Sequence, residues 1–275
     1  MDALPNHISF VGTGNMATAI MGGLLAAGFS ADQISGGDPS EDARANWASR
    51  GVSALSAQAG DVTERADLVI LAVKPQVMEA VTQSLRGKIK PGAVVMSIAA
   101  GVTVQALREM FGDPDLNVIR CMPNTPALIG LGASGLFASA SVSDDQRNQV
   151  GGVMSVVGSV VWLEQEAHID AVTAVSGSGP AYFFAFMEAM IKAGEKLGLD
   201  HHIATELTVQ TALGAASLVK SETQSIESLR RNVTSPGGTT ARALDSFDRG
   251  GLATLVNKAM QACFDRAVEM SEEYK

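Results

Sequence analysis

The chain has 275 residues, 46% of them hydrophobic and 18% charged, which is the balance of a globular protein and not of a disordered one. Its net charge of −9 argues against nonspecific nucleic-acid binding, which needs clustered lysine and arginine. The start, "MDALPNHISF", lacks a secretion-signal pattern, and the longest apolar run, "VMSVVGSVVWL", is too short to span a membrane. We therefore expect a cytoplasmic protein that binds neither nucleic acid nor membrane, with Cys121 and Cys263 buried and reduced.

Short apolar runs alternate with helical patterns from residue 8 to residue 164. The expected strands are 8–12, 33–38, 66–73, 93–100, 117–123, 132–139 and 159–164, and the expected helices are 16–28, 40–50, 76–89, 103–111 and 144–158. The run "ADLVILAV" is apolar almost throughout, which is typical of a strand covered on both faces. This alternation predicts an α/β fold with a doubly wound, mainly parallel sheet over residues 1–164.

The pattern changes after Glu164, and from His168 onward we expect helices alone. Long helical patterns cover 180–198, 202–220 and 252–274, and the first of them is apolar on most of its circumference. Such a helix belongs inside a larger assembly, so we expect residues 165–275 to form an all-α domain that completes its core with a second copy, as a homodimer or higher homo-oligomer.

A glycine-rich turn follows the first expected strand. "VGTGNMA" places Gly12, Gly14 and Ala17 in the spacing G-x-G-x-x-A between a strand and a helix. In that context the first glycine permits the turn, the second lets the backbone approach a pyrophosphate, and the small third residue packs the helix on the sheet. The sequence therefore predicts a dinucleotide site that includes Thr13, Asn15 and Met16.

The end of the second strand leaves the choice of dinucleotide open. Asp38 could bind a ribose 2′-hydroxyl and favour NAD, whereas Arg44, with Ser35 or Ser40, could bind the 2′-phosphate of NADP. Asp38 and Ser40 could instead simply cap the following helix.

Three later strands end at the same predicted edge of the sheet, where ligands bind in doubly wound folds. Lys74 is held extended by the proline after it, and small residues after the next strand suit close approach of a flat ring. The expected cofactor contacts along this edge are Ala72, Val73, Lys74, Pro75, Ala99, Ala100 and Asn124.

Two further glycine-rich turns open helices in the second half, "AVSGSGPAYFF" and "TSPGGTTARAL". Neither carries a basic residue or a cluster of metal ligands, so the backbone N–H groups of a helix start point to a small carboxylate as guest. Capping by the two threonines is the alternative interpretation, although it does not explain the preceding glycines.

With these motifs in order, "FVGTGNMA", "ILAVKPQ", "SIAAGV", "CMPNTP", "AVSGSGPAYFF" and "SPGGTT", the whole chain resembles pyrroline-5-carboxylate reductase. The resemblance implies a Rossmann domain followed by an intertwined helical dimerisation domain, and NADPH-dependent reduction of 1-pyrroline-5-carboxylate to L-proline, the last step of proline biosynthesis, with NADH as a possible donor. It also implies that the neighbouring subunit can supply the substrate turn.

The resemblance further implies a role for residues of both later turns. Thr240 would contact the ring nitrogen of the imine as the catalytic residue, and the substrate would be bound by Ser178, Gly179, Ser235, Gly238, Thr239 and Thr240. No histidine is expected to act, since His7, His201 and His202 read as surface or capping residues. Gln58 stands where many members have an asparagine, and Glu222 matches a family glutamate only loosely.

Two other functions were considered. A 3-hydroxyacid dehydrogenase would need a lysine and an asparagine one helical turn apart, but Lys192 is followed at that spacing by Lys196. A non-catalytic dinucleotide sensor would leave the two later turns without a purpose.

Overall fold

The computed structural model describes residues 4–274, which form two compact units. Within these residues the first unit comprises 4–178 and 263–274, and the second comprises Gly179–Ala262. The chain thus leaves the first unit once and returns to it within its last helix. The predicted boundary near residue 164 stays a prediction about where one functional domain gives way to the next.

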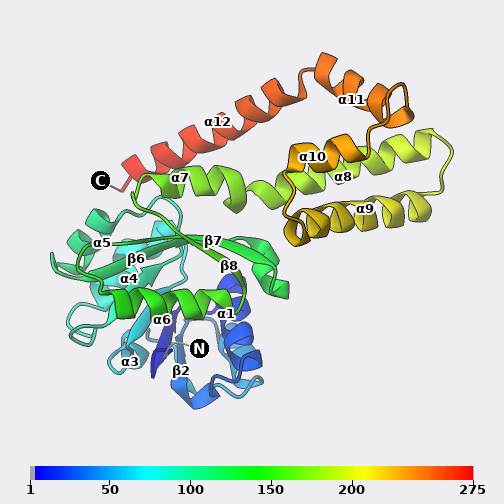
Figure 1. The fold of residues 1–275 in the computed structure, drawn as a ribbon. Helices are drawn as coiled ribbons and strands as arrows, with labels where there is room; N and C mark the ends of the chain where they lie inside the picture. The colour runs from blue at the N-terminus through cyan, green and yellow to red at the C-terminus, as the bar shows by residue number, and fades with distance from the viewer. Residues whose placement is uncertain (1–3, 275) are drawn as a thin grey trace. The chain divides into compact units, whose positions relative to one another are not determined.

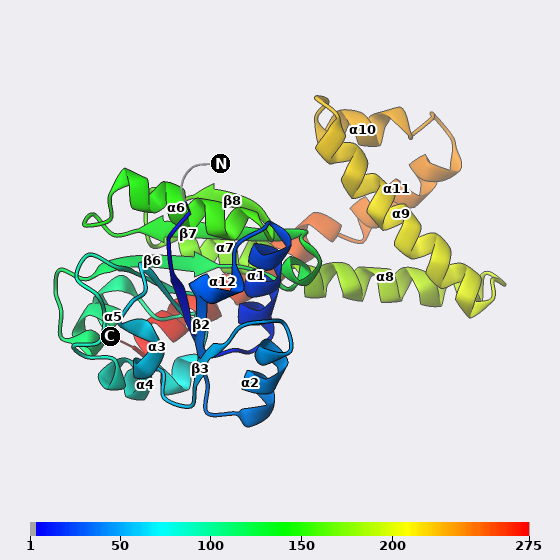
Figure 2. The same ribbon diagram turned by 90° about the horizontal axis from the view of Figure 1, so that it is seen from below.

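An eight-stranded sheet is the centre of the first unit, with the order β3-β2-β1-β4-β5-β6-β7-β8. Figures 1 and 2 show helices on both faces of this sheet. The strands are β1 Ile8–Val11, β2 Ile34–Gly37, β3 Ala54–Ser56, β4 Leu68–Leu71, β5 Val94–Ser97, β6 Asn117–Met122, β7 Gly132–Ala138 and β8 Gly158–Trp162. All neighbouring pairs are parallel except β6 with β7, so the expectation of a doubly wound, mainly parallel sheet is confirmed.

The side chains of alternate strand residues pack into two separate hydrophobic cores, because side chains along a strand point to opposite faces of the sheet. In β4, Leu68 and Ile70 join the core beneath α1, α2 and α6, whereas Val69 and Leu71 join the core beneath α4 and α5. The helices of this unit are α1 Asn15–Ala26, α2 Glu41–Ala48, α3 Gly60–Thr63, α4 Met78–Ser84, α5 Val104–Phe111, α6 Asp144–Ser155 and α7 His168–Val172, with short turns at Ala31–Gln33, Pro75–Val77 and Thr125–Ile129 (η3).

The end of the last helix also belongs to the first unit. The helix α12 runs over Leu252–Glu272, and Tyr274 packs on the core beneath α4 and α5. Both views show this red terminal segment beside α5 (Figures 1 and 2).

The second unit is helical, as expected. It contains α8 Gly179–Lys196, α9 His201–Ser221, α10 Ile226–Asn232, α11 Thr239–Arg249 and the start of α12. Gly194 and Ala204 let α8 and α9 approach closely, since a Cβ on Gly194 would lie 3.3 Å from that of Ala204. Within the described residues no strand follows β8, and no helix is long and apolar enough to cross a membrane.

The apolar α8 is not covered within the single chain. Most of its residues are exposed, and Phe183 keeps 69% of its surface accessible. Other large apolar residues of the unit are exposed too, among them Ile203, Leu207, Leu213, Leu255 and Val256. A surface of this kind needs a partner in water.

Candidate active site

The first glycine turn is built as its spacing predicts. Gly12 has a φ of +90°, and a Cβ there would lie 2.7 Å from the carbonyl oxygen of Ala72, so no other residue fits at this place in the turn between β1 and α1. Its N–H donates to the carbonyl of Gly37 over 2.8 Å, which ties the turn to β2. Ala17 is buried and packs α1 on the sheet.

Gly14 is the N-cap of α1, and the space around it is open. No side chain caps the helix, no acidic residue stands in its first turn, and a Cβ at Gly14 would meet nothing within 4 Å. Gly14 and Asn15 are exposed and Met16 is half-buried, so the first amides of α1 are accessible. Unpaired N–H groups and the positive end of a helix suit a pyrophosphate, and these residues therefore fit a dinucleotide.

The Asp38 carboxylate is tied to this turn. Its Oδ2 accepts hydrogen bonds from the Thr13 backbone N–H and hydroxyl at 2.8 and 3.1 Å, and its Oδ1 accepts the Ser40 N–H at 2.9 Å. Ser40 itself caps α2 through the N–H of Ala43. The capping role of Ser40 is thus present, while Asp38 serves the glycine turn.

Arg44 lies over the end of β2. Its Nη1 donates to the carbonyl of Asp38 at 2.6 Å, which uses one of the five donors of a guanidinium.

The alternative role for Ser35, a phosphate contact, is wrong. Ser35 is 2% exposed, its hydroxyl donates to the carbonyl of Val62 and it lies 3.1 Å from Nε2 of His7. His7 is accordingly half-buried, not a surface residue, and burial lowers the pKa of its imidazole.

The strand ends β1, β4 and β5 share one edge of the sheet, because Val11 pairs with Leu71 and Leu71 pairs with Ser97. The residues after these strands are therefore neighbours along that edge: Ala72, Val73, Lys74 and Pro75 after β4, and Ala99 and Ala100 after β5. Lys74 is extended, with φ −65° and ψ 145°, and its side chain is exposed. The edge thus combines a fixed lysine with a stretch of small side chains.

Asn124 follows β6 at this edge but is already bonded within the protein. Its Nδ2 donates to the carbonyl of Ser176, its Oδ1 accepts the N–H of Ala133, and it is 9% exposed. The side chain joins β7 to the π-helix η4, Thr173–Gly177, which leaves a direct cofactor contact of its amide without structural support.

The η4 segment is a feature that the sequence pattern did not reveal. It leads to Ser178, whose N–H donates to the carbonyl of Thr173 and whose hydroxyl accepts a 3.3 Å hydrogen bond from Sγ of Cys263. Single π-turns occur often at functional sites. Gly179 then begins α8, so this glycine-rich segment opens a helix as expected.

The turn before α11 repeats the design of the first turn. Gly237 has a φ of +71°, and Gly238 is an extended N-cap without a side-chain cap or an acidic residue in the first turn. Capping by Thr239 and Thr240 is therefore wrong, because both lie inside the helix. Gly238 donates its own N–H to the carbonyl of Ser235 at 3.1 Å, so the amides left for a ligand are those of the two threonines.

Outside these turns, the ionisable side chains of the described residues give little indication of a further site. Within residues 4–274 no group of three His, Cys, Asp or Glu side chains could hold a metal. Burial raises the pKa of the Cys121 thiol to about 12, so this thiol is inert at neutral pH. His201 and His202 stand exposed at the start of α9, as expected.

Comparison with known proteins identifies the family. Residues 166–270 match the family described as pyrroline-5-carboxylate reductase dimerisation, and residues 7–101 match the one described as NADP oxidoreductase, coenzyme F420-dependent. A pyrroline-5-carboxylate reductase of Pseudomonas aeruginosa is 49% identical over 97% of both chains. The structure of the Coxiella burnetii enzyme is 39% identical with a TM-score of 0.93, over 98% of this chain and 99% of that one. A Plasmodium falciparum pyrroline carboxylate reductase with NADP bound is 26% identical, with a TM-score of 0.86 over 98% and 99% of the chains. The chain belongs to the pyrroline-5-carboxylate reductase family, whose members reduce 1-pyrroline-5-carboxylate to L-proline, and residues 166–270 are its dimerisation domain.

Proposed function

We propose that the two helix starts with a glycine N-cap, those of α1 and α11, divide the reaction between them. The start of α1 binds the pyrophosphate of the cofactor, and the start of α11 binds the carboxylate of 1-pyrroline-5-carboxylate. One contrast carries this assignment: α2, α5, α6, α9 and α10 each begin with a Ser, Thr or Asp that accepts a backbone N–H, whereas α1 and α11 begin with glycines that offer no side-chain acceptor. The short helices α3, α4 and α7 also lack a side-chain cap, but they begin with Ala or Val and not with a glycine turn. Helix amides without a cap need another acceptor, and an anionic ligand supplies it.

The cofactor in this proposal is NADPH, with NADH as a weaker donor. Arg44 supports it, because its guanidinium stands at the end of β2, where the adenosine ribose binds in this fold. The Asp38 carboxylate is occupied by Thr13 and Ser40, which leaves it less able to select a 2′-hydroxyl. The NADP found in the Plasmodium falciparum structure agrees with this choice.

For this reaction the chain mainly has to orient the substrate against the cofactor. Bound NADPH supplies a hydride to C5 of the protonated imine, and the bond electrons of C=N pass to the nitrogen. The amides of Thr239 and Thr240 hold the substrate carboxylate, while the Thr240 hydroxyl orients the ring nitrogen. Ser178, Gly179 and Ser235 complete the wall of the substrate site. A charged imine is already electrophilic, so positioning accounts for most of the rate enhancement.

A cytosolic location belongs to the same proposal. Cys121 and Cys263 are free thiols, which fits a reducing compartment.

Proline substitution at the first helical residue tests the two anion sites separately. Proline is well accepted at that position and removes one N–H, and the extended backbone of Gly14 and Gly238 suits a residue before proline. Thr239→Pro should raise the KM for the imine with little change in NADPH affinity. Asn15→Pro should weaken NADPH binding instead.

The matched control is Glu41→Pro at the first residue of α2, whose N-terminus is already capped by Ser40. It should leave both constants unchanged. NADPH oxidation followed at the nicotinamide absorbance band gives the kinetic values, and repeating it with NADH gives the cofactor preference. Unaltered kinetics in both Asn15→Pro and Thr239→Pro would remove the helix amides from the site.

A further inference from the structure

An ion pair between a buried arginine and a partly exposed glutamate lies in the first unit and takes no part in the sites described so far. Arg120 on β6 is 3% exposed, and its Nη1 lies 3.0 Å from Oε1 of Glu166, which precedes α7. Its Nη2 has no hydrogen-bond partner among the described residues. A buried guanidinium is costly without a counter-charge, so Glu166 is held at this place by Arg120.

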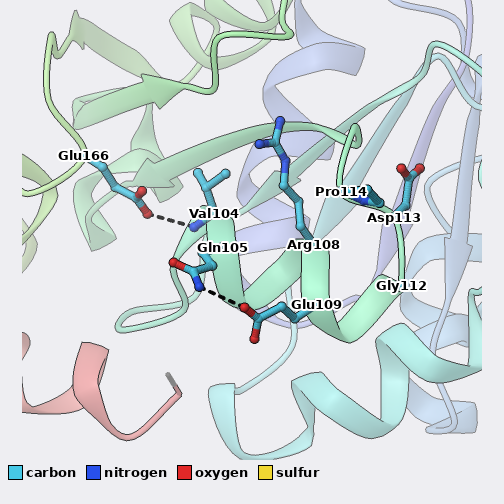
Figure 3. Close-up of a pocket in the computed structure, with 8 residues that line it drawn as sticks. All are labelled: Val104, Gln105, Arg108, Glu109, Gly112, Asp113, Pro114 and Glu166. Atoms are coloured by element: carbon cyan, nitrogen blue, oxygen red, sulfur yellow. Dashed lines mark hydrogen bonds between the residues drawn. The ribbon is translucent and has the colours of Figure 1, made fainter.

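The same Glu166 oxygen also reaches the start of α5. It accepts the backbone N–H of Val104, the first residue of that helix, at 2.8 Å. Figure 3 shows the carboxylate turned toward Val104 with this bond drawn. Since Thr103 caps the N–H of Ala106, the helix start has two side-chain acceptors, one of them from a segment 62 residues away. A carboxylate at this end also interacts favourably with the helix dipole.

The loop 98–103 leads from β5 to the first residue of α5, and it also packs against α12. Gly101 has a φ of +79°, and a Cβ there would lie 3.0 Å from both Cβ and the carbonyl oxygen of Met270. Beside Met270, the Ser271 hydroxyl contacts Oδ1 of Asp170 on α7 at 3.4 Å. Burial raises the pKa of the Asp170 carboxyl, and the charge of Arg120 opposes that rise.

The loop is thus contacted at both of these places: Glu166 accepts the N–H of Val104 at its end, and Met270 packs on Gly101. The charge of Arg120 acts on both Glu166 and Asp170. We propose that Glu166, held by Arg120, is a positioning residue that sets the loop 98–103 against the nicotinamide end of the cofactor. Ser271 supports the same loop through α12. This inference rests on the proposed function, since it takes Ala99 and Ala100 as cofactor contacts.

The experiment compares Glu166→Gln, Glu166→Ala and Ser271→Ala with the control Glu164→Gln, a nearby exposed glutamate. Two readouts use the protein without substrate: the Kd for NADPH from its fluorescence, and the hydrogen exchange of amides 102–106. Thermal melts show that each variant is folded. Glu166→Gln keeps an acceptor for Val104 but loses the charge opposite Arg120, so it should fall between wild type and Glu166→Ala.

We expect Glu166→Ala to raise the NADPH Kd about ten-fold and to expose the Val104 amide to exchange. Glu166→Gln and Ser271→Ala should raise the Kd about two- to five-fold, while the KM for the imine and the values for Glu164→Gln stay unchanged. If Glu166→Ala does not fold, the other two variants decide. A Kd within error of wild type in folded Glu166→Gln and Ser271→Ala overturns the inference and leaves the proposed function intact. Failure of the wild-type chain to bind NADPH overturns both.

Discussion

The two glycines of the first turn should respond oppositely to replacement by alanine. At Gly12 the positive φ costs a residue with a side chain about 1–3 kcal/mol, and the new Cβ would lie 2.7 Å from the carbonyl oxygen of Ala72. That neighbour is backbone, so no side-chain rotation relieves the contact, and overpacking adds about 1–3 kcal/mol. We therefore expect Gly12→Ala to lower the free energy of unfolding of the first unit by about 2–6 kcal/mol.

At Gly14 the backbone has φ −70° and ψ −171°, which any residue adopts, and a Cβ would meet nothing within 4 Å. Gly14→Ala should therefore stay within about 1 kcal/mol of the wild-type stability. The added methyl group, however, occupies the space of the pyrophosphate, so the Kd for NADPH should rise at least about ten-fold, or about 1.4 kcal/mol.

Gly28→Ala is the matched control, because Gly28 has the same φ of +90° but open space around it. Unfolding can be followed by fluorescence of Trp47, which is fully buried in this unit, and NADPH binding by titration. At roughly 2–4 °C for each kcal/mol, Gly12→Ala should lower the thermal midpoint by about 4–24 °C, and Gly28→Ala by less. Equal effects at Gly12 and Gly28 would refute the steric argument, and normal NADPH affinity in Gly14→Ala would refute the pyrophosphate site.

Three further predictions concern the substrate turn, the cofactor and pH. Thr240→Ala should lower kcat/KM about ten- to several hundred-fold through loss of one positioned hydrogen bond, with Thr240→Ser restoring part of it; unchanged steady-state kinetics would contradict its role. Arg44→Ala should raise the Kd for NADPH about ten- to a hundred-fold and barely alter that for NADH, as measured by titration, whereas equal losses would point away from the 2′-phosphate. Burial lowers the pKa of His7, so its contribution to stability is complete above its ordinary pKa of 6.5 and is lost as the pH falls through the lowered pKa. In denaturant unfolding between pH 7 and pH 5, the free energy of unfolding of His7→Gln should therefore fall less steeply than that of the wild type. Equally steep falls in the two proteins would contradict this.

The sheet and the glycine turns could be predicted because their physics is local. A strand covered on both faces must be apolar throughout, and Gly12 and Gly14 stand at fixed spacing for reasons of backbone shape. The strand β3 was missed because Ala54–Ser56 is short and partly exposed, which leaves no apolar run to detect.

The direction in which a side chain points, and its contacts with residues far away in the sequence, could not be predicted from the sequence. Ser35 and Asn124 have residue types that suit ligand contacts, yet both turn inward and bond within the protein. The pairing of Arg120 with Glu166 joins segments 46 residues apart, so no spacing rule marks it. The apolar circumference of α8 did indicate a core completed by a second copy, but the sequence does not show which of its residues that copy would cover.

We propose that the start of α11 binds the substrate carboxylate while the start of α1 binds the cofactor pyrophosphate. A crystal structure with NADP and proline bound measures this directly. We predict proline with its carboxylate on the N–H groups of Thr239 and Thr240, and the pyrophosphate at Gly14 and Asn15. Proline bound elsewhere in the chain, with the amides of α11 facing only water, would contradict the account.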